Sequence, residues 1–415
     1  NIIISLHSYT RLDYLDAVRA FALILGIIFH ASLSFMPIFI GWAVMDISTS
    51  NVIGIFALVS HSFRMELFFL IAGFFAHMKF HQQGAVAFFQ LRIVRIGIPF
   101  IIGWIILRPL LVSGWVMGAE SMQGNVNVLP ALTNAFTMFE SLAGMTKFLL
   151  VGTHLWFLYY LLIISVSVVV LRYFIELNSA VKHNILMFSD NVIAKLCYSR
   201  FAILLLAIPT VWCLWFMDHW GVDTADKSLL PHIPVSLLYG GFFTFGWLMH
   251  RQSELMEQFA RLTWSKVILC LSAIIGSVIL SSFEMSLAHP QYTLLKAGYL
   301  FSYAIMMWTL VSLTIGCCKG LFKKSNKVLR YIADASYWLY LIHLPIVIWL
   351  QIAFAELLFH WGIKLVAICS LTFFISIVIY DVFVRSTFVG ATLNGKKRKR
   401  VIFTRQIKIR NERYA

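Results

Sequence analysis

Long apolar stretches alternate with short polar connections along nearly the whole chain. An apolar run of about 20 residues is the length that an α-helix needs to cross the hydrocarbon core of a bilayer. The pattern therefore predicts an all-α, polytopic transmembrane bundle of about ten helices. Their expected ranges are 16–38, 57–80, 94–116, 147–171, 201–218, 230–250, 266–283, 294–316, 331–354 and 361–385.

The composition agrees with a membrane protein and excludes several other classes. Hydrophobic residues make up 60% of the 415 residues and charged residues 12%, whereas soluble domains are nearer half apolar and a quarter charged. Such a chain is neither an ordinary cytosolic enzyme nor a disordered segment. The six cysteines form no CxxC pair or Cys/His cluster, so we expect no metal site and no disulfide framework.

The formal net charge of +15 comes from Lys and Arg spread over short connections, with one dense block at Lys396–Arg400. We expect no nucleic-acid binding, because no matching fold signature accompanies the charge. Basic residues fall almost entirely in alternate connections, and the others hold only Lys147 and Lys227. The positive-inside rule then predicts that both termini are cytoplasmic. Residues 1–385 would form the membrane domain, and 386–415 a basic cytoplasmic tail that contacts anionic lipid.

The largest expected outer connection, about 117–146, is polar and contains Gly118, Gly124 and Pro130. It is interpreted either as a lid that faces the substrate or as a solvated connector. The sequence favours neither interpretation.

Ionisable side chains inside apolar runs are candidates for function, because burying a charge in lipid is costly. The first run carries Asp16, Arg19 and His30. Arg19 and His30 differ by about 20° on a helical wheel, and Asp16 lies three residues before Arg19, close enough for an ion pair. Gly26 leaves room on the same face. This face is predicted to combine an ion pair, an open notch and an imidazole.

The second run adds His61, Arg64 and Glu66. At 1.5 Å per residue, Arg64 and Glu66 lie roughly 20–24 Å above the cytoplasmic edge, at the depth of His30. A cation, a carboxylate and an imidazole at one level predict a catalytic centre. The alternative is a structural Arg64–Glu66 pair that holds two helices together.

Two arginines, Arg92 and Arg95, precede the third run at its expected cytoplasmic end. They share a helix face and suit phosphate oxygens, although ordinary anchoring by positive residues is the alternative. A lone histidine in a bundle is more often a hydrogen-bonded structural residue than a catalyst, and that interpretation stays open. The candidates for substrate binding are His61, His154, Trp156, Tyr337 and His343.

Taken together, these residues resemble the membrane acyltransferase-3 family. The matching segments are LDYLDAVRAFALILGIIFH with its Arg-x10-His spacing, MELFFLIAGFF, RIVR, HLWFLYYLL and SYWLYLIHLPIV, in the family's order. The resemblance implies a ten- or eleven-helix enzyme that takes acyl groups from cytoplasmic acyl-CoA, a co-substrate and not a permanent cofactor. His30 matches the family's essential histidine, Arg19 its arginine partner, and Arg92 and Arg95 its RxxR. Ala72 replaces the usual Ser.

Within the family, HSFRMELFFLIAGFF followed by RIVRIGIPF is most similar to members that transfer succinyl groups onto periplasmic glucans. This implies succinyl-CoA as donor, a periplasmic glucan as acceptor and a bacterial inner membrane as location. Acyl transfer needs a base for the hydroxyl proton and a group that stabilises the oxyanion. We assign the base to His30, and the oxyanion or a succinyl carboxylate to Arg64. Glu66 stands where many members carry Asp.

Two other functions use the same features. An O-acetyltransferase of another surface glycan would need the same core. A proton-coupled transporter or flippase would also bury His, Arg and Glu, but the sequence contains no inverted repeat. Aromatic residues facing lipid would allow a homodimer.

Overall fold

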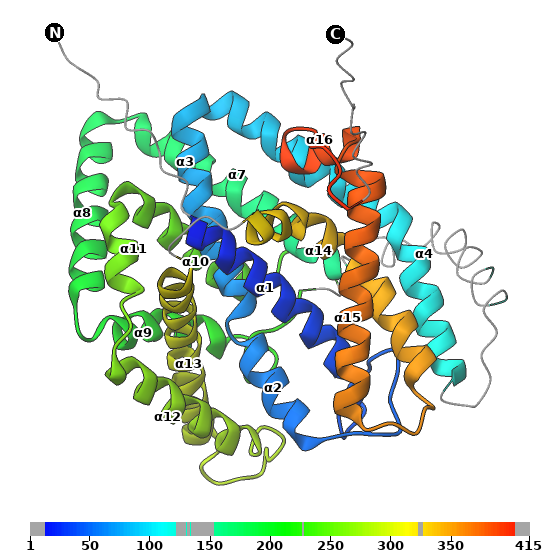
Figure 1. The fold of residues 1–415 in the computed structure, drawn as a ribbon. Helices are drawn as coiled ribbons and strands as arrows, with labels where there is room; N and C mark the ends of the chain where they lie inside the picture. The colour runs from blue at the N-terminus through cyan, green and yellow to red at the C-terminus, as the bar shows by residue number, and fades with distance from the viewer. Residues whose placement is uncertain are drawn as a thin grey trace, which may run out of the picture.

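The computed structural model describes residues 13–121, 130, 133, 153–225, 228–322 and 327–402. Within this part of the chain the regular elements are helices, without strands (Figure 1). The all-α prediction is confirmed. The elements are α1 (Asp13–Ser32), η1 (Leu33–Phe35), α2 (Asn51–His61), α3 (Arg64–Arg92), η2 (Ile93–Gly97), α4 (Ile98–Ser121), η3 (Thr153–Leu155), α7 (Trp156–Glu176), α8 (Ser179–Tyr198), α9 (Ala202–Trp215), α10 (Ile233–Arg251), α11 (Ser253–Phe259), α12 (Trp264–Ser281), α13 (Tyr292–Leu321), α14 (Lys327–Phe354), α15 (Trp361–Ile379), η4 (Tyr380–Val384) and α16 (Phe388–Asn394).

Among the described residues, seven helical segments are long and apolar enough to cross a membrane, or eight if α8 and α9 form one bent span. One of them, Asn51–Glu120, is 70 residues long and includes two of the expected helices, 57–80 and 94–116. As one straight helix it would extend roughly 105 Å, which is far more than the thickness of a bilayer. Gly84, with φ +79°, interrupts the helical geometry between them. Every expected range contains a helix. The number that cross the bilayer, and the side on which the termini lie, stay predictions. The outer connection 117–146 lies largely outside the described residues.

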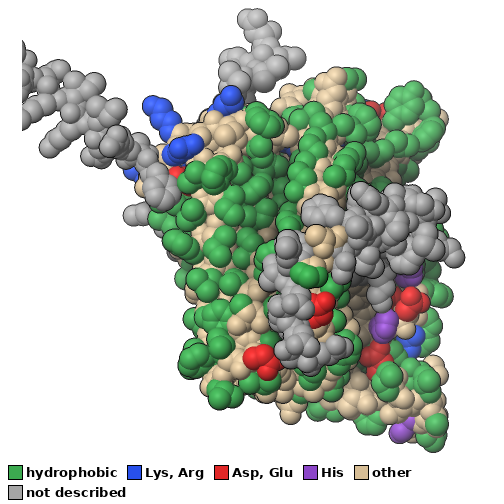
Figure 2. Space-filling view, turned by 90° about the vertical axis from the view of Figure 1, so that its right-hand side faces the viewer, with side chains coloured by type: hydrophobic (Ala, Val, Ile, Leu, Met, Phe, Trp, Pro, Cys, Tyr) green, Lys and Arg blue, Asp and Glu red, His purple; other side chains and the backbone are tan. Residues whose placement is uncertain are grey.

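The surface of the bundle is apolar. Large side chains on α4 and α15 are more than half exposed, including Ile101, Ile105 and Phe374. On one face, hydrophobic side chains cover most of the height, and Lys and Arg gather near its upper end (Figure 2). Apolar surface of this extent is suited to contact with lipid and not with water.

The second expected helix, 57–80, is divided in two. α2 ends at His61 and α3 begins at Arg64, and the two residues between them form a turn. This break places Arg64 and Glu66 in the first turn of α3. The free backbone N–H groups of a helix N-terminus favour a carboxylate such as that of Glu66.

α1 runs across the middle of the bundle in Figure 1 and contacts α3, α13 and α14. Its residues Leu15, Val18 and Ala22 are fully buried. A polar face on such a helix points into the interior of the protein and not into lipid. The fold therefore gives the ionisable residues of α1 an internal location.

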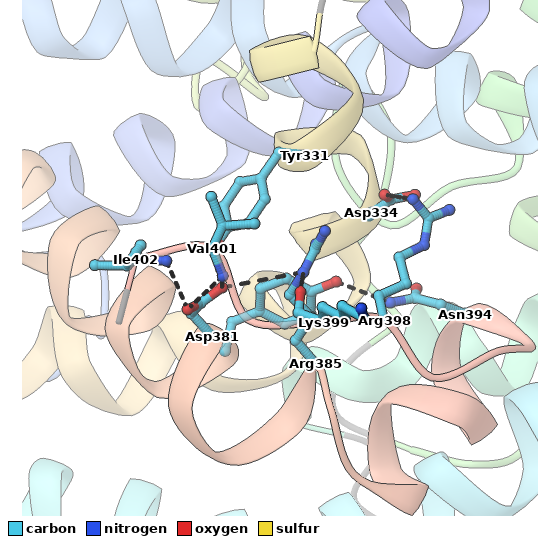
Figure 3. A network of polar contacts seen from close by, with 10 residues as sticks. Tyr331, Asp334, Asp381, Arg385, Asn394, Arg398, Lys399, Val401 and Ile402 are labelled. Carbon is cyan, nitrogen blue, oxygen red and sulfur yellow. Dashed lines mark hydrogen bonds and ion pairs between the residues drawn. The ribbon is translucent and has the colours of Figure 1, made fainter. Parts of the chain in front are cut away.

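The chain after α15 folds back onto the bundle. The π-helical turn η4 and the short helix α16 follow α15, and residues 395–402 return toward α14 (Figure 3). The sequence predicts a basic tail over 386–415. The described part of that segment is packed against the protein as far as Ile402.

Candidate active site

One large cavity extends through the interior beside α1. Its volume is about 2490 Å³, whereas sites for drug-sized ligands usually measure ~300–1,000 Å³. Along α1 its wall reaches from Asp16 to His30, a rise of about 21 Å. Arg92 and Arg95 line the cavity beyond the Asp16 end, and Trp42 lines it beside His30. The cavity therefore has room for more than one ligand of that size.

The polar face predicted for α1 is present. Arg19 Nη1 lies 3.5 Å from Asp16 Oδ1, and the two residues are three positions apart on the helix. Asp16, Arg19, Gly26 and His30 all line the cavity. The helical period alone brings them to one side.

His30 is surrounded by aromatic rings. The Trp42 ring is stacked on the imidazole with centroids 5.7 Å apart, and the ring of His343 lies 5.3 Å away. His30 Nδ1 is buried and has no hydrogen-bond partner among the described residues. A neutral imidazole with an available nitrogen is suited to accept a proton from a hydroxyl group.

Two further histidines lie near His30: His343 is next to it, and His154 is next to His343. The rings of His343 and His154 have centroids 5.7 Å apart. His343 Nδ1 lies 2.8 Å from the carbonyl oxygen of Tyr340, and His154 Nε2 lies 2.9 Å from that of Leu341. Because carbonyl oxygens only accept, these nitrogens carry the hydrogens and the opposite nitrogens are acceptors. Both histidines are thus hydrogen-bonded structurally, and both also line the cavity.

Arg64 lies against the same face of α1. Its guanidinium carbon is 4.2 Å from the centroid of the Phe29 ring, and its Cδ would lie 3.7 Å from a Cβ added to Gly26. The notch at Gly26 is therefore occupied by the stem of Arg64. Arg64 is buried at 6% exposure and lines the cavity.

Glu66 faces elsewhere. It is fully buried, does not line the cavity, and interacts electrostatically with Tyr239 of α10 and Tyr303 of α13. Residues two apart on a helix point to different sides, which separates Glu66 from Arg64. The two charges interact electrostatically, but the described residues show no direct ion pair or hydrogen bond between these side chains. Every other candidate residue lines the cavity.

Arg92 and Arg95 form the basic part of the cavity wall. The guanidinium of Arg92 lies 4.7 Å from the Phe88 ring centroid, and the Tyr337 hydroxyl donates to the Arg95 carbonyl at 2.6 Å. Within the described residues neither guanidinium has a carboxylate partner. Two unpaired guanidinium groups on one wall favour an anionic ligand.

The remaining candidate residues, His61 and Trp156, make a polar and an aromatic contact respectively. His61 Nε2 lies 3.1 Å from Thr224 Oγ1. Trp156 packs edge-to-face on Tyr160 and stacks on Tyr239. Ala72 lines the cavity, so the hydroxyl that a serine would carry there is missing from the cavity wall.

Sequence reasoning missed the residues that support His30. Gln351 is 1% exposed; its Nε2 donates to the carbonyl oxygen of His30, and its Oε1 accepts from Trp42 Nε1 at 2.9 Å. An amide inside an apolar run was a usable signal for Gln351. Trp42 lies in a connection, where the sequence pattern carries no such signal.

An acidic group lines the cavity near His61. The ligand atoms of Asp218, Asp223 and His232 lie within 4.8 Å of one another. Asp223 already accepts hydrogen bonds from the backbone N–H groups of Asp218 and His219. This grouping therefore has a structural explanation as a turn.

Comparison with known proteins gives a consistent result. A family model described as an acyltransferase domain, acyltransferase-3, matches residues 12–381. Glucans biosynthesis protein C of Salmonella heidelberg (strain SL476) and that of Salmonella typhi are each 24% identical to this chain over 392 residues. The aligned region covers 92% of this chain and 94% of each relative. No solved structure matches the chain.

Proposed function

Because the chain belongs to the acyltransferase-3 family, we propose that it transfers an acyl group from acyl-CoA to a hydroxyl group of a glycan on the other side of the membrane. The donor is succinyl-CoA from the cytoplasm, and the acceptor is a periplasmic glucan. The relatives named for glucan biosynthesis support this choice of acceptor. The bacterial inner membrane is the corresponding location.

The observation that supports the proposal is that one large cavity in the described part of the chain is lined both by Arg92 and Arg95 and by His30. Arg92 and Arg95, which have no carboxylate partner among the described residues, line it at one end, and His30 lines it about 21 Å along α1 from Asp16. CoA phosphates suit the two guanidinium groups, and the extended pantetheine arm suits a passage of this length. The thioester would then lie near His30.

In the proposed reaction His30 acts as the general base. It takes the proton from a sugar hydroxyl, whose oxygen attacks the thioester carbonyl carbon. The new C–O bond forms, the C–S bond breaks, and the CoA thiolate leaves and recovers a proton from the imidazolium of His30. Arg64 stabilises the oxyanion of the intermediate or binds the distal carboxylate of a succinyl group. The Asp16–Arg19 pair supports the donor passage from the same face of α1.

The test uses purified protein in liposomes, labelled succinyl-CoA or acetyl-CoA, and a glucan acceptor. We expect transfer of succinyl and at least a hundredfold loss of rate in His30→Ala, because a general base contributes about 10²–10⁴-fold. His183→Ala is the matched control, since His183 is exposed on α8 and does not line the cavity.

Each other result would change the assignment. Transfer of acetyl alone would keep the acyltransferase and reject succinyl-CoA. An unchanged rate in His30→Ala would remove His30 as the base. Failure to turn over either donor would contradict the proposal and favour a transporter.

A further inference from the structure

The last described residues of the chain are held by buried charges. We name residues 395–402 the C-terminal strap. The fully buried carboxylate of Asp381 in η4 accepts hydrogen bonds from the backbone N–H groups of Val401, at 3.1 Å, and Ile402, at 3.0 Å. It also accepts from the Tyr331 hydroxyl at 3.1 Å (Figure 3). Charge-assisted hydrogen bonds of this kind fix a segment in place.

A second set of contacts fixes the middle of the strap. Arg385 Nε donates to the carbonyl oxygen of Lys399 at 2.8 Å, and the Arg398 N–H donates to the carbonyl oxygen of Arg385 at 3.0 Å. The Arg385 guanidinium also lies over the ring of Tyr331, at 4.7 Å. The strap is therefore an ordered part of the bundle.

The turn into the strap lies directly on Arg95. Gly395 follows α16 with φ +80°, the left-handed conformation that commonly ends a helix. A Cβ at this position would overlap the guanidinium group of Arg95. Glycine is thus required both by the backbone conformation and by the close approach of Arg95.

The strap places a third guanidinium in the cavity wall. Arg398 Nη1 lies 2.5 Å from Asp334 Oδ2 of α14, and both residues line the cavity together with Arg92 and Arg95. Arg398 Nε is buried and has no hydrogen-bond partner among the described residues. A guanidinium has five N–H donors, so the ion pair orients Arg398 and leaves donors for a further ligand.

From this placement we propose that the C-terminal strap is part of the donor site, and that Arg398 binds a phosphate group at the nucleotide end of the donor. The inference rests on the proposed function. Arg92, Arg95 and Arg398 bring three positive charges to the cavity wall, whereas the carboxylates of Asp334 and Asp16 there are already paired with Arg398 and Arg19. An excess of guanidinium groups suits the several phosphates of a CoA nucleotide. A phospholipid headgroup offers the same phosphate chemistry, and the experiment distinguishes the two.

The experiment compares a donor that carries phosphates with one that lacks them. Wild-type protein and Arg398→Gln are reconstituted in nanodiscs of zwitterionic lipid and supplied with succinyl-CoA or succinyl-pantetheine. We expect the KM for succinyl-CoA to rise about tenfold in the variant, with kcat unchanged. The kinetics with succinyl-pantetheine are expected to stay unchanged, because that donor has no phosphate for Arg398 to bind.

Matched variants separate the role of Arg398 from general effects. Lys397→Gln removes the same charge from an exposed neighbouring position that does not line the cavity, and should change KM less than twofold. Arg398→Lys should recover part of the affinity. Gly395→Ala should raise the KM for succinyl-CoA as well, since the added methyl group displaces Arg95.

Three results would overturn the inference. An unchanged KM in Arg398→Gln, with active wild type, would reject the strap as a donor site and leave the proposed function intact. An equal loss with both donors would make Arg398 a purely structural residue. An effect of the variant that appears only when anionic phospholipid is added would assign the site to lipid phosphate. Wild type that turns over neither donor would instead reject the proposed function.

Discussion

Single buried polar side chains determine the geometry around His30. The Gln351 amide donates to the carbonyl oxygens of His30 and Ala31, both at 3.0 Å. Carbonyl groups in the last turn of a helix have no partner within the helix, so this amide satisfies two of them. The side-chain oxygen of Gln351 accepts a hydrogen bond from Trp42 Nε1. One residue thus ties the end of α1 to the aromatic ring that covers His30.

A buried ion pair holds the connection that carries Trp42. Lys364 Nζ lies 2.7 Å from Asp46 Oδ1, with side-chain exposures of 0% and 2%. Lys364 also donates to the carbonyl oxygen of Ala355, and Asp46 accepts from the backbone N–H of Ser48. The additional hydrogen bonds compensate part of the cost of burying both charges.

We predict that Lys364→Met destabilises the protein strongly. Removing one partner leaves the Asp46 carboxylate buried without its cation, which costs about 3–5 kcal/mol. The measurement is thermal unfolding in detergent, compared with Ile363→Met at an exposed neighbouring position. The double variant Asp46→Asn/Lys364→Met should recover much of the loss. An unfolding temperature for Lys364→Met that equals wild type would contradict a stabilising pair.

At the scale of elements, the contact between α3 and α10 positions Arg64. A Cβ on Gly246 of α10 would overlap the carbonyl oxygen of Leu70, and one on Gly73 of α3 would overlap that of Phe243. The two backbones are therefore as close as glycine allows, an arrangement common between membrane helices. α3 begins with Arg64, so a shift of this helix moves Arg64 relative to α1.

The corresponding prediction compares two glycines of α10. Gly246→Ala forces the helices apart and is expected to cost about 1–3 kcal/mol, with reduced transfer activity. Gly240→Ala is the control, because nothing lies within 4 Å of its added Cβ, and alanine stabilises a helix by up to about 1 kcal/mol relative to glycine. Thermal unfolding and transfer rates test both variants. Equal behaviour of the two would show that the close contact is unimportant.

At the scale of the whole molecule, the charged side chains that line the cavity are unevenly distributed. Three of its arginines, Arg92, Arg95 and Arg398, gather at one end, and Asp218 and Asp223 lie at the other, near His61. A polyanionic donor is attracted to the first end and repelled from the second. If the proposed function holds, this distribution of charge favours donor entry from the end that holds the three arginines.

This asymmetry predicts one-sided use of the donor. In liposomes, external succinyl-CoA should be consumed only by molecules whose Arg92–Arg95 end faces outward. The orientation is measured by protease cleavage of a tag at the C-terminus, which the positive-inside rule places at that same end. The initial rate should rise in proportion to the cleavable fraction. Consumption that does not depend on orientation would contradict separate access.

The sequence by itself determined where the long apolar helices lie and which residues of α1 share a face, but it left the 20-residue helix α8 as part of a connection. Both follow from local physics, since bilayer thickness sets the length of an apolar run and the helical period sets the angle between side chains. For the same reason Asp16, Arg19 and His30 were found as a group before any contact was known. The family motifs added Arg92 and Arg95.

Only the tertiary structure decided which polar groups meet. The expected depth in the membrane placed Arg64 and Glu66 at the same level. The directions of the two side chains follow instead from the start of α3 and from its packing against α1 and α10. The pairs Asp46–Lys364 and Asp334–Arg398 join residues far apart in the sequence. Such contacts depend on how whole helices pack, which no local pattern of hydrophobic and polar residues specifies.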